Sequence, residues 1–92
     1  MIQNFKHKGL KKLFEKGNNS GVNAQHVKRL RLILALLETA ETVEDMDLPA
    51  LSMHELKGNR KGTWALTVSG NWRVTFRLES GDALDVNYED YH

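Results

Sequence analysis

The stretch TWALTVSGNWRVTFRL, residues 63–78, together with ALDVNYE, residues 83–89, decides the fold of this chain. Both stretches alternate apolar and polar residues. Successive side chains of a strand point to opposite faces of a sheet, so this alternation predicts half-buried strands. Gly70-Asn71 and Gly81-Asp82 interrupt the alternation and are typical hairpin residues. The sequence therefore predicts three antiparallel strands joined by two hairpins.

The alternation also divides the side chains of these strands between two faces. The apolar face is expected to carry Trp64, Leu66, Val68, Trp72, Val74, Phe76, Leu78, Leu84, Val86 and Tyr88. The polar face is expected to carry Thr63, Thr67, Arg73, Thr75, Arg77, Asp85, Asn87 and Glu89. An antiparallel sheet can pack one face on a core and leave the other to solvent or a ligand. We expect the polar face to be open in this way.

The register of the first hairpin follows from matching apolar residues across it. A two-residue loop, Gly70-Asn71, would pair an apolar residue with a charged one, because a one-residue slip reverses every side chain. A three-residue loop, residues 69–71, is therefore predicted, with the pairs Val68–Trp72, Leu66–Val74 and Trp64–Phe76. The second hairpin leaves two registers open, which place Arg73 opposite either Asn87 or Glu89.

The residues before this sheet predict two helices. Residues 6–16 have apolar side chains on one side and are followed by Gly17, which is placed to end a helix. Asn23 can cap a second helix that runs to about Ala40. Residues 51–56 are a plausible first strand of the sheet, and residues 2–5 give a weak signal for an edge strand. The prediction is one α+β domain over residues 1–92, with both helices on one face of the sheet.

Composition restricts the class of protein and its partners. The chain has 92 residues, no cysteine and a formal net charge of +1. No apolar run approaches the roughly 20 residues of a membrane span, and the first residues lack a signal-peptide core, so a cytoplasmic protein without membrane contact is expected. The charges are segregated: residues 1–31 and 57–77 are basic, and residues 38–47 are acidic. This segregation favours a polyanionic partner, although the first basic block is equally typical of a solvated helix surface.

Several side chains have the chemistry that phosphodiester cleavage without a metal requires. Such a reaction needs groups that transfer protons and cations that stabilise charge on the phosphate. His54, Asp90, Tyr91 and His92 are candidates for proton transfer, and Lys57 and Arg73 are candidate phosphate ligands. The alternative is that His54 and His92 are solvated polar residues and that Arg73 pairs with Glu89. No histidine spacing typical of a metal site is present, so no metal and no cofactor are expected.

The remaining polar candidates have simpler interpretations. His7 and His26 lie on the expected helices and are expected to be ordinary surface residues. Asn71, at the tip of the first hairpin, is expected to supply a positive φ angle. A role for Asn71 in reading the edge of a base is the sharper alternative.

Four segments resemble the HigB toxins of the RelE/ParE superfamily of bacterial type II toxin–antitoxin systems. These segments are residues 5–10, 54–58, 70–76 and 87–92. The resemblance implies the RelE-like fold and a ribosome-dependent endoribonuclease that cuts mRNA in the ribosomal A site with the mRNA 2′-hydroxyl and no metal. It implies a HigA-type antitoxin, a helix-turn-helix DNA-binding protein, as partner.

The resemblance also assigns roles to individual residues. His54, Asp90, Tyr91 and His92 match catalytic positions, and Lys57 and Arg73 match phosphate-facing positions. Asn71 matches a position that reads the codon, and Arg60 in the basic loop is included among the substrate-binding residues. Two alternatives stay open. One is a non-catalytic, ParE-like inhibitor of DNA gyrase with the same fold, and the other is a generic RNA-binding module.

Overall fold

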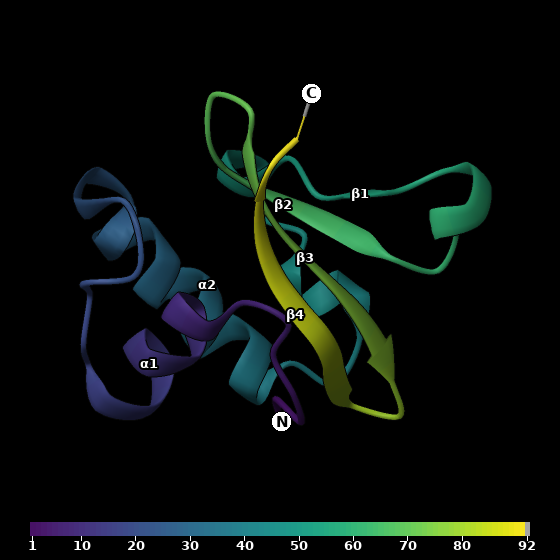
Figure 1. The fold of residues 1–92 in the computed structure, drawn as a ribbon. Coiled ribbons are helices and arrows are strands. Elements are labelled where there is room, and N and C mark those ends of the chain that lie inside the picture. Colours follow the sequence, from purple (N-terminus) through teal and green to yellow (C-terminus); the bar gives the residue numbers. More distant parts are fainter. Residues whose placement is uncertain (92) are drawn as a thin grey trace.

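The computed structural model describes residues 1–91, which form two helices and a four-stranded antiparallel sheet (Figure 1). The elements are α1 (Lys8–Lys16), α2 (Val27–Thr39), β1 (His54–Glu55), β2 (Trp64–Ser69), β3 (Trp72–Glu79) and β4 (Asp82–Asp90). The strands follow one another in the order β1-β2-β3-β4. Both helices lie on one side of the sheet, and the first residues run alongside β4 (Figure 1). The predicted α+β architecture is confirmed, although the first strand is shorter than residues 51–56.

Side-chain and glycine caps set the ends of the helices close to the predicted positions. The His7 ring accepts a hydrogen bond from the Leu10 N–H at 3.0 Å and so caps α1, which ends at Gly17 with a φ of 67°. Asn23 accepts from the Gln25 N–H at 2.9 Å and begins a short 3-10 turn that leads into α2. These bonds satisfy backbone groups that a helix end would otherwise leave without a partner.

The core lies between the helices and the apolar face of the sheet. Its fully or nearly fully buried members include Leu13, Leu30, Leu34, Leu37, Leu66, Val74, Phe76 and Val86. This confirms the prediction that the apolar sides of the two helices pack on the apolar face of the sheet. Phe14 and Trp64 are only partly buried, because they pack at the margin of this cluster.

The β2–β3 hairpin corrects the predicted loop. Leu66 pairs with Val74 and Trp64 with Phe76, as predicted, but Trp72 pairs with Ser69 and not with Val68. A bulge between Thr67 and Ser69 leaves Val68 as an extra residue, so that a two-residue loop and a buried Val68 coexist. The positive φ of 54° in this loop belongs to Gly70, and the expectation for Asn71 was wrong.

A second bulge interrupts the pairing of β3 with β4. Arg73 lies opposite Glu89, one of the two registers left open by the sequence, but the register shifts between Thr75 and Arg77. Asp85, in this bulge, has a φ of 54°. The shift reverses the alternation beyond it, so Ala83 is fully buried while Leu84 is only partly buried. The expectation that Leu84 belongs to the apolar face was therefore wrong.

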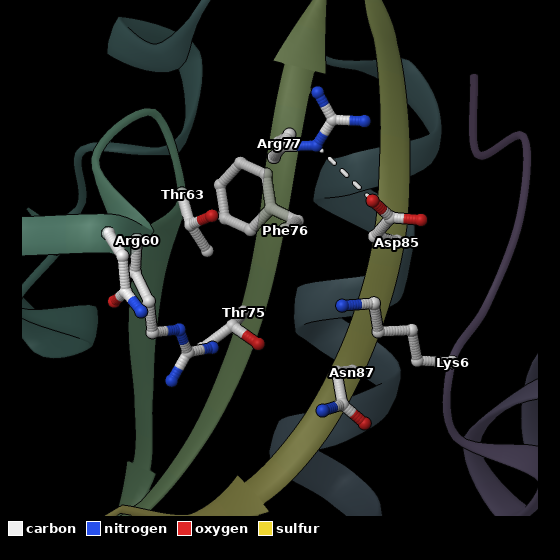
Figure 2. A pocket seen from close by; sticks show the side chains of 9 residues that line it. Lys6, Arg60, Thr63, Thr75, Phe76, Arg77, Asp85 and Asn87 are labelled. Atoms are coloured by element: carbon white, nitrogen blue, oxygen red, sulfur yellow. Dashed lines mark hydrogen bonds and ion pairs between the residues drawn. The ribbon is translucent and has the colours of Figure 1, made fainter.

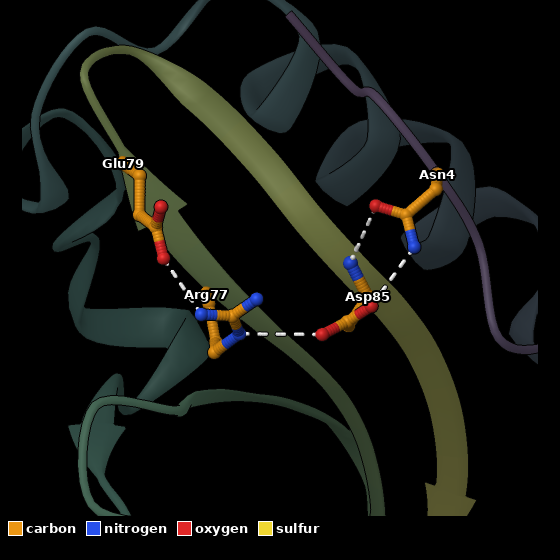
Figure 3. Close-up of polar contacts among 4 residues, drawn as sticks. All are labelled: Asn4, Arg77, Glu79 and Asp85. Atoms are coloured by element: carbon orange, nitrogen blue, oxygen red, sulfur yellow. Dashed lines mark hydrogen bonds and ion pairs between the residues drawn. The ribbon is translucent and has the colours of Figure 1, made fainter.

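The first residues of the chain are fixed to this second bulge. Ile2 and Phe5 form isolated parallel bridges with Ala83 and Val86, so residues 2–5 lie along the sheet edge but do not form the edge strand that the sequence weakly indicated. The Asn4 side chain donates to the Asp85 carboxylate at 2.8 Å and accepts from the Asp85 N–H at 3.1 Å (Figure 3). The two bonds hold residues 2–6 against the edge of β4.

Two histidines are parts of the packed structure and not surface residues. His26 is 6% exposed, and its Nδ1 lies 2.6 Å from the Tyr88 hydroxyl. His7 is half-buried as the cap of α1, and its ring meets that of Tyr88 edge-on. Burial lowers the pKa of His7, which keeps its Nδ1 free to accept. The expectation that these are ordinary surface histidines was wrong, because their partners are distant in sequence.

Replacing Gly9 by alanine is expected to lower the free energy of unfolding by about 1–3 kcal/mol, the range for overpacked interiors. Gly9 and Gly21 approach each other backbone to backbone, and a Cβ on Gly9 would lie 2.7 Å from the Gly21 carbonyl carbon. Urea unfolding measures the effect, with exposed Lys12→Ala on the same helix as the control. Equal stability of the two variants would contradict this close approach.

Candidate functional site

The polar face of the sheet is bridged by an ion pair that the sequence does not predict. Arg60, in the loop between β1 and β2, donates from both terminal nitrogens to the Glu89 carboxylate on β4, at 3.0 and 2.9 Å. Glu89 also accepts from the Thr75 hydroxyl at 2.8 Å and from the Asn87 amide at 3.3 Å. These donors, led by Arg60, hold the pKa of Glu89 below its usual range. The loop is thereby tied across the face, and Thr75 beneath it is only 2% exposed.

Replacing Glu89 by glutamine is expected to lower the free energy of unfolding by about 1 kcal/mol near neutral pH, the upper end for partly exposed ion pairs. The lowered pKa makes this stabilisation complete above the ordinary pKa of a glutamate and removes it as the pH falls through the lowered value. Urea unfolding from about pH 7 down to about pH 3 measures the difference, with exposed Glu15→Gln as the control. If Glu89→Gln lost stability in acid as steeply as the wild type, the assignment would be wrong.

Arg73 lies beside this ion pair but does not join it. Its Nη1 donates to the carbonyls of Gly70 and Trp72, at 2.6 and 3.0 Å, so the guanidinium folds back over the hairpin. Its Nε is buried and has no hydrogen-bond partner among residues 1–91. Glu89 is directly opposite in the sheet yet bonds to Arg60 instead. Within residues 1–91 the charge of Arg73 is not neutralised by a carboxylate within ion-pair distance.

The end of β4 reaches the same corner of the molecule. Asp90 lies opposite Trp72, and the Tyr91 N–H donates to the Asn71 carbonyl at 2.7 Å. Tyr91 is 38% exposed. The pKa of Arg60 is raised, first by the hydrogen bonds that Arg60 donates to Glu89 and to a smaller extent by the charge interaction with Tyr91. Asn71, Arg73, Asp90 and Tyr91 are thus gathered at the β2–β3 turn. His92 lies outside the described residues.

The other two candidates lie at the opposite edge of the sheet. His54 is exposed on β1 and belongs to the row His54–Ala65–Thr75–Asn87, which crosses all four strands. Three strand spacings separate the backbones of β1 and β4, about 14 Å. The His54 Nδ1 lies 3.2 Å from the Ser52 carbonyl, which can only accept, so in the neutral ring this contact places the proton on Nδ1 and leaves Nε2 as the acceptor. Lys57 borders a separate shallow hollow with Glu55 and Lys61.

A polar hollow of about 210 Å³ lies on the polar face between these two edges (Figure 2). Its lining consists of Lys6, Asn59, Arg60, Thr63, Thr75, Phe76, Arg77, Asp85 and Asn87. Three of these residues are cations and come from the first residues, the basic loop and β3. No group of three histidine or acidic side chains arranged to hold a metal ion occurs within residues 1–91.

Comparison with known proteins assigns the chain to a family. The family model of the HigB-like toxins, described as RelE-like toxins of type II toxin–antitoxin systems, matches residues 3–92. The chain belongs to this family. Its members are toxins that pair with an antitoxin, so an antitoxin is the partner that this HigB-like toxin requires.

A curated relative gives the family a biochemical activity. The chain is 51% identical, over all 92 residues of both proteins, to the endoribonuclease HigB of Proteus vulgaris. This relative agrees with the resemblance drawn from the four short segments of the sequence. No helix within residues 1–91 of the HigB-like toxin is long and apolar enough to cross a membrane.

The structure adds residues that sequence reasoning did not assign to the site. Glu89 was considered only as a partner of Arg73, and Lys6 and Thr63 were not considered as site residues. Lys6 reaches the polar face because residues 2–5 pair with β4, and no local pattern in the sequence reports that contact. The segregated basic charge of the first block was the one signal that pointed toward it.

Proposed function

We propose that this protein is a ribosome-dependent endoribonuclease that cleaves mRNA in the ribosomal A site and so arrests translation and growth. The observation that carries the proposal is its 51% full-length identity to an endoribonuclease of the same family. The toxin acts in the cytoplasm, where translating ribosomes are, and is neutralised by a HigA-type antitoxin with a helix-turn-helix DNA-binding fold. The guanidinium of Arg73, at the same turn as Tyr91, has no carboxylate within ion-pair distance among residues 1–91. It supports the proposal because a phosphate needs such a cation.

The proposed reaction uses the mRNA itself as nucleophile. The 2′-hydroxyl attacks the adjacent phosphorus and the 5′-oxygen of the next nucleotide leaves, so one proton is removed from the first oxygen and one is given to the second. His54, with Nε2 free to accept, and His92 are assigned to these proton transfers, supported by Asp90 and Tyr91. Arg73 and Lys57 stabilise the charge on the phosphate.

Arg60 and Asn71 have supporting roles in this proposal. Arg60 is bound to Glu89 in the free toxin, so a phosphate must compete with that carboxylate before Arg60 contacts the mRNA. Asn71 lies at the turn beside Tyr91, a position from which its side chain reads the codon. No metal is assigned to the reaction, because protein side chains and the 2′-hydroxyl supply every group that it needs.

Primer extension on an mRNA under translation tests the proposal. Cuts at defined codon positions that require the ribosome support it, and they should persist when a chelator removes trace transition metals while ribosomal magnesium is kept. Cuts in free mRNA alone would contradict the ribosome dependence. Inhibition of gyrase supercoiling without any mRNA cuts would favour the ParE-like alternative.

A further inference from the structure

Among residues 1–91, Lys6 is the cation of the hollow that forms no ion pair within 4 Å. Arg60 is paired with Glu89, and Arg77 is paired with Asp85 at 3.2 Å and with Glu79. Lys6 has no ion pair within 4 Å among residues 1–91, although its charge helps to lower the pKa of Asp85 after stronger contributions, first that of Asn4. Figure 2 shows its ammonium group extending across β4 into the hollow.

Uncharged polar side chains line the same hollow and have hydrogen-bonding capacity left over among residues 1–91. Asn59 and Thr63 make no side-chain hydrogen bond within the part of the chain that the structure describes, and both line the hollow. Asn87 donates its amide to Glu89 at 3.3 Å, which leaves its carbonyl oxygen as an acceptor. A cation that has no ion pair within residues 1–91, beside these donors and acceptors, fits one phosphate with the hydroxyls of its sugar, and not an apolar ligand.

The position of Lys6 is fixed by the backbone and not by its own side chain. The Lys6 N–H donates to the Val86 carbonyl at 2.8 Å, and the Asn4–Asp85 pair holds the preceding turn of chain on the β4 bulge. The ammonium therefore lies on the same face as Glu89, which is three residues beyond Val86 on β4, and as Arg73, which pairs with Glu89. A long lysine side chain on a fixed backbone is suited to bind phosphate as a point charge.

From this arrangement we propose that the hollow is a second nucleotide subsite, in which Lys6 binds a backbone phosphate of single-stranded RNA next to the cleaved one. The Thr63 and Asn87 side chains contact the sugar of that nucleotide. The inference rests on the proposed function, since it extends the path of the same RNA strand across the polar face. It gives the hollow and the first residues of the chain a role in holding the substrate.

The test is a titration of the isotope-labelled toxin with a short RNA in which 2′-deoxy substitution prevents cleavage. NMR at low salt detects weak binding, and the amide signals of Lys6, Thr63 and Asn87 are expected to shift. Lys6→Ala should weaken binding about fivefold and reduce the dependence of log affinity on log salt by about 0.7, the value for one phosphate contact on a single strand. Lys6→Arg should restore most of both effects.

Lys12→Ala is the matched control, because Lys12 is an exposed lysine on α1 outside the hollow. It should bind the RNA as the wild type does. Equal losses in Lys6→Ala and Lys12→Ala would assign binding to the basic surface as a whole and overturn the subsite. Wild-type RNA binding that leaves these three amide signals unmoved, or no wild-type binding at all, would overturn it as well.

The two proposals fail in different ways. If the toxin binds the non-cleavable RNA through Lys6 but never cuts translated mRNA, the subsite is supported and the proposed nuclease activity is contradicted. If the toxin cuts translated mRNA and Lys6→Ala is as active as the wild type at limiting toxin concentration, the nuclease activity is supported and the subsite is contradicted.

Discussion

Replacing His92 by alanine is expected to slow cleavage of ribosome-bound mRNA by about 10²–10⁴-fold, the typical contribution of a general acid or base. The loss arises because one of the two proton transfers in the proposed reaction then falls to water. Single-turnover cleavage at saturating toxin measures the chemical step directly. The variant should bind ribosomes normally and should no longer arrest growth when it is expressed without antitoxin.

The pH dependence of the rate separates a chemical role from a structural one. If His92 transfers a proton, one limb of the pH–rate profile should be lost in His92→Ala and the other should stay. Tyr91→Phe is the companion variant, since it keeps the backbone N–H that bonds to Asn71 and removes only the hydroxyl of an exposed side chain. A frayed, unused chain end would give parental rates for His92→Ala. That result would transfer the catalytic role to His54 and Lys57.

Replacing Phe76 by alanine is expected to cost about 3–5 kcal/mol of the roughly 5–15 kcal/mol that stabilises a domain of this kind. Phe76 is fully buried in the middle of β3, opposite Trp64 and between the sheet and the helices. Its removal leaves a cavity that the packed neighbours cannot fill. Urea unfolding followed by tryptophan fluorescence measures the loss.

Phe14→Ala provides the matched control for this loss. Phe14 also contacts the core, and its ring centroid lies 5.6 Å from that of Phe5, but it is only partly buried. Its substitution removes the same atoms from a site that solvent already reaches, so the cost should be clearly smaller. Equal destabilisation of Phe14→Ala and Phe76→Ala would show that the centre of the core has been misplaced.

Sequence patterns predicted the elements well and the irregularities poorly. Period-two alternation identified β2, β3 and β4 and the buried side of Phe76, and the caps at Asn23 and Gly17 marked helix ends. The two bulges were missed because the apolar–polar alternation of the sequence continues through them. The extra residue changes only the loop or the register of the pairing. The wrong pairing of Val68 and the wrong face for Leu84 both follow from that one cause.

The candidate site was predictable where residues are close in sequence or match a family motif. The gathering of Asn71, Arg73 and Tyr91 follows from a hairpin and the strand beside it. The pairing of Arg60 with Glu89 could not be read in the same way, because 29 residues separate them and a loop must fold over the face. The burial of His26 against Tyr88 depends on a contact across 62 residues and likewise leaves no local pattern.

The attachment of residues 2–6 to β4 has a consequence for folding during synthesis. Asn4 and Asp85 are 81 positions apart, so the polypeptide must have left the exit tunnel as far as Asp85 before the two side chains can meet. The β2–β3 hairpin can form earlier, because its contacts are local and close quickly. A nascent chain therefore cannot complete the face that we assign to RNA. If the toxin acts on ribosomes, as we propose, the ribosome that synthesises it would be spared until Asp85 has emerged.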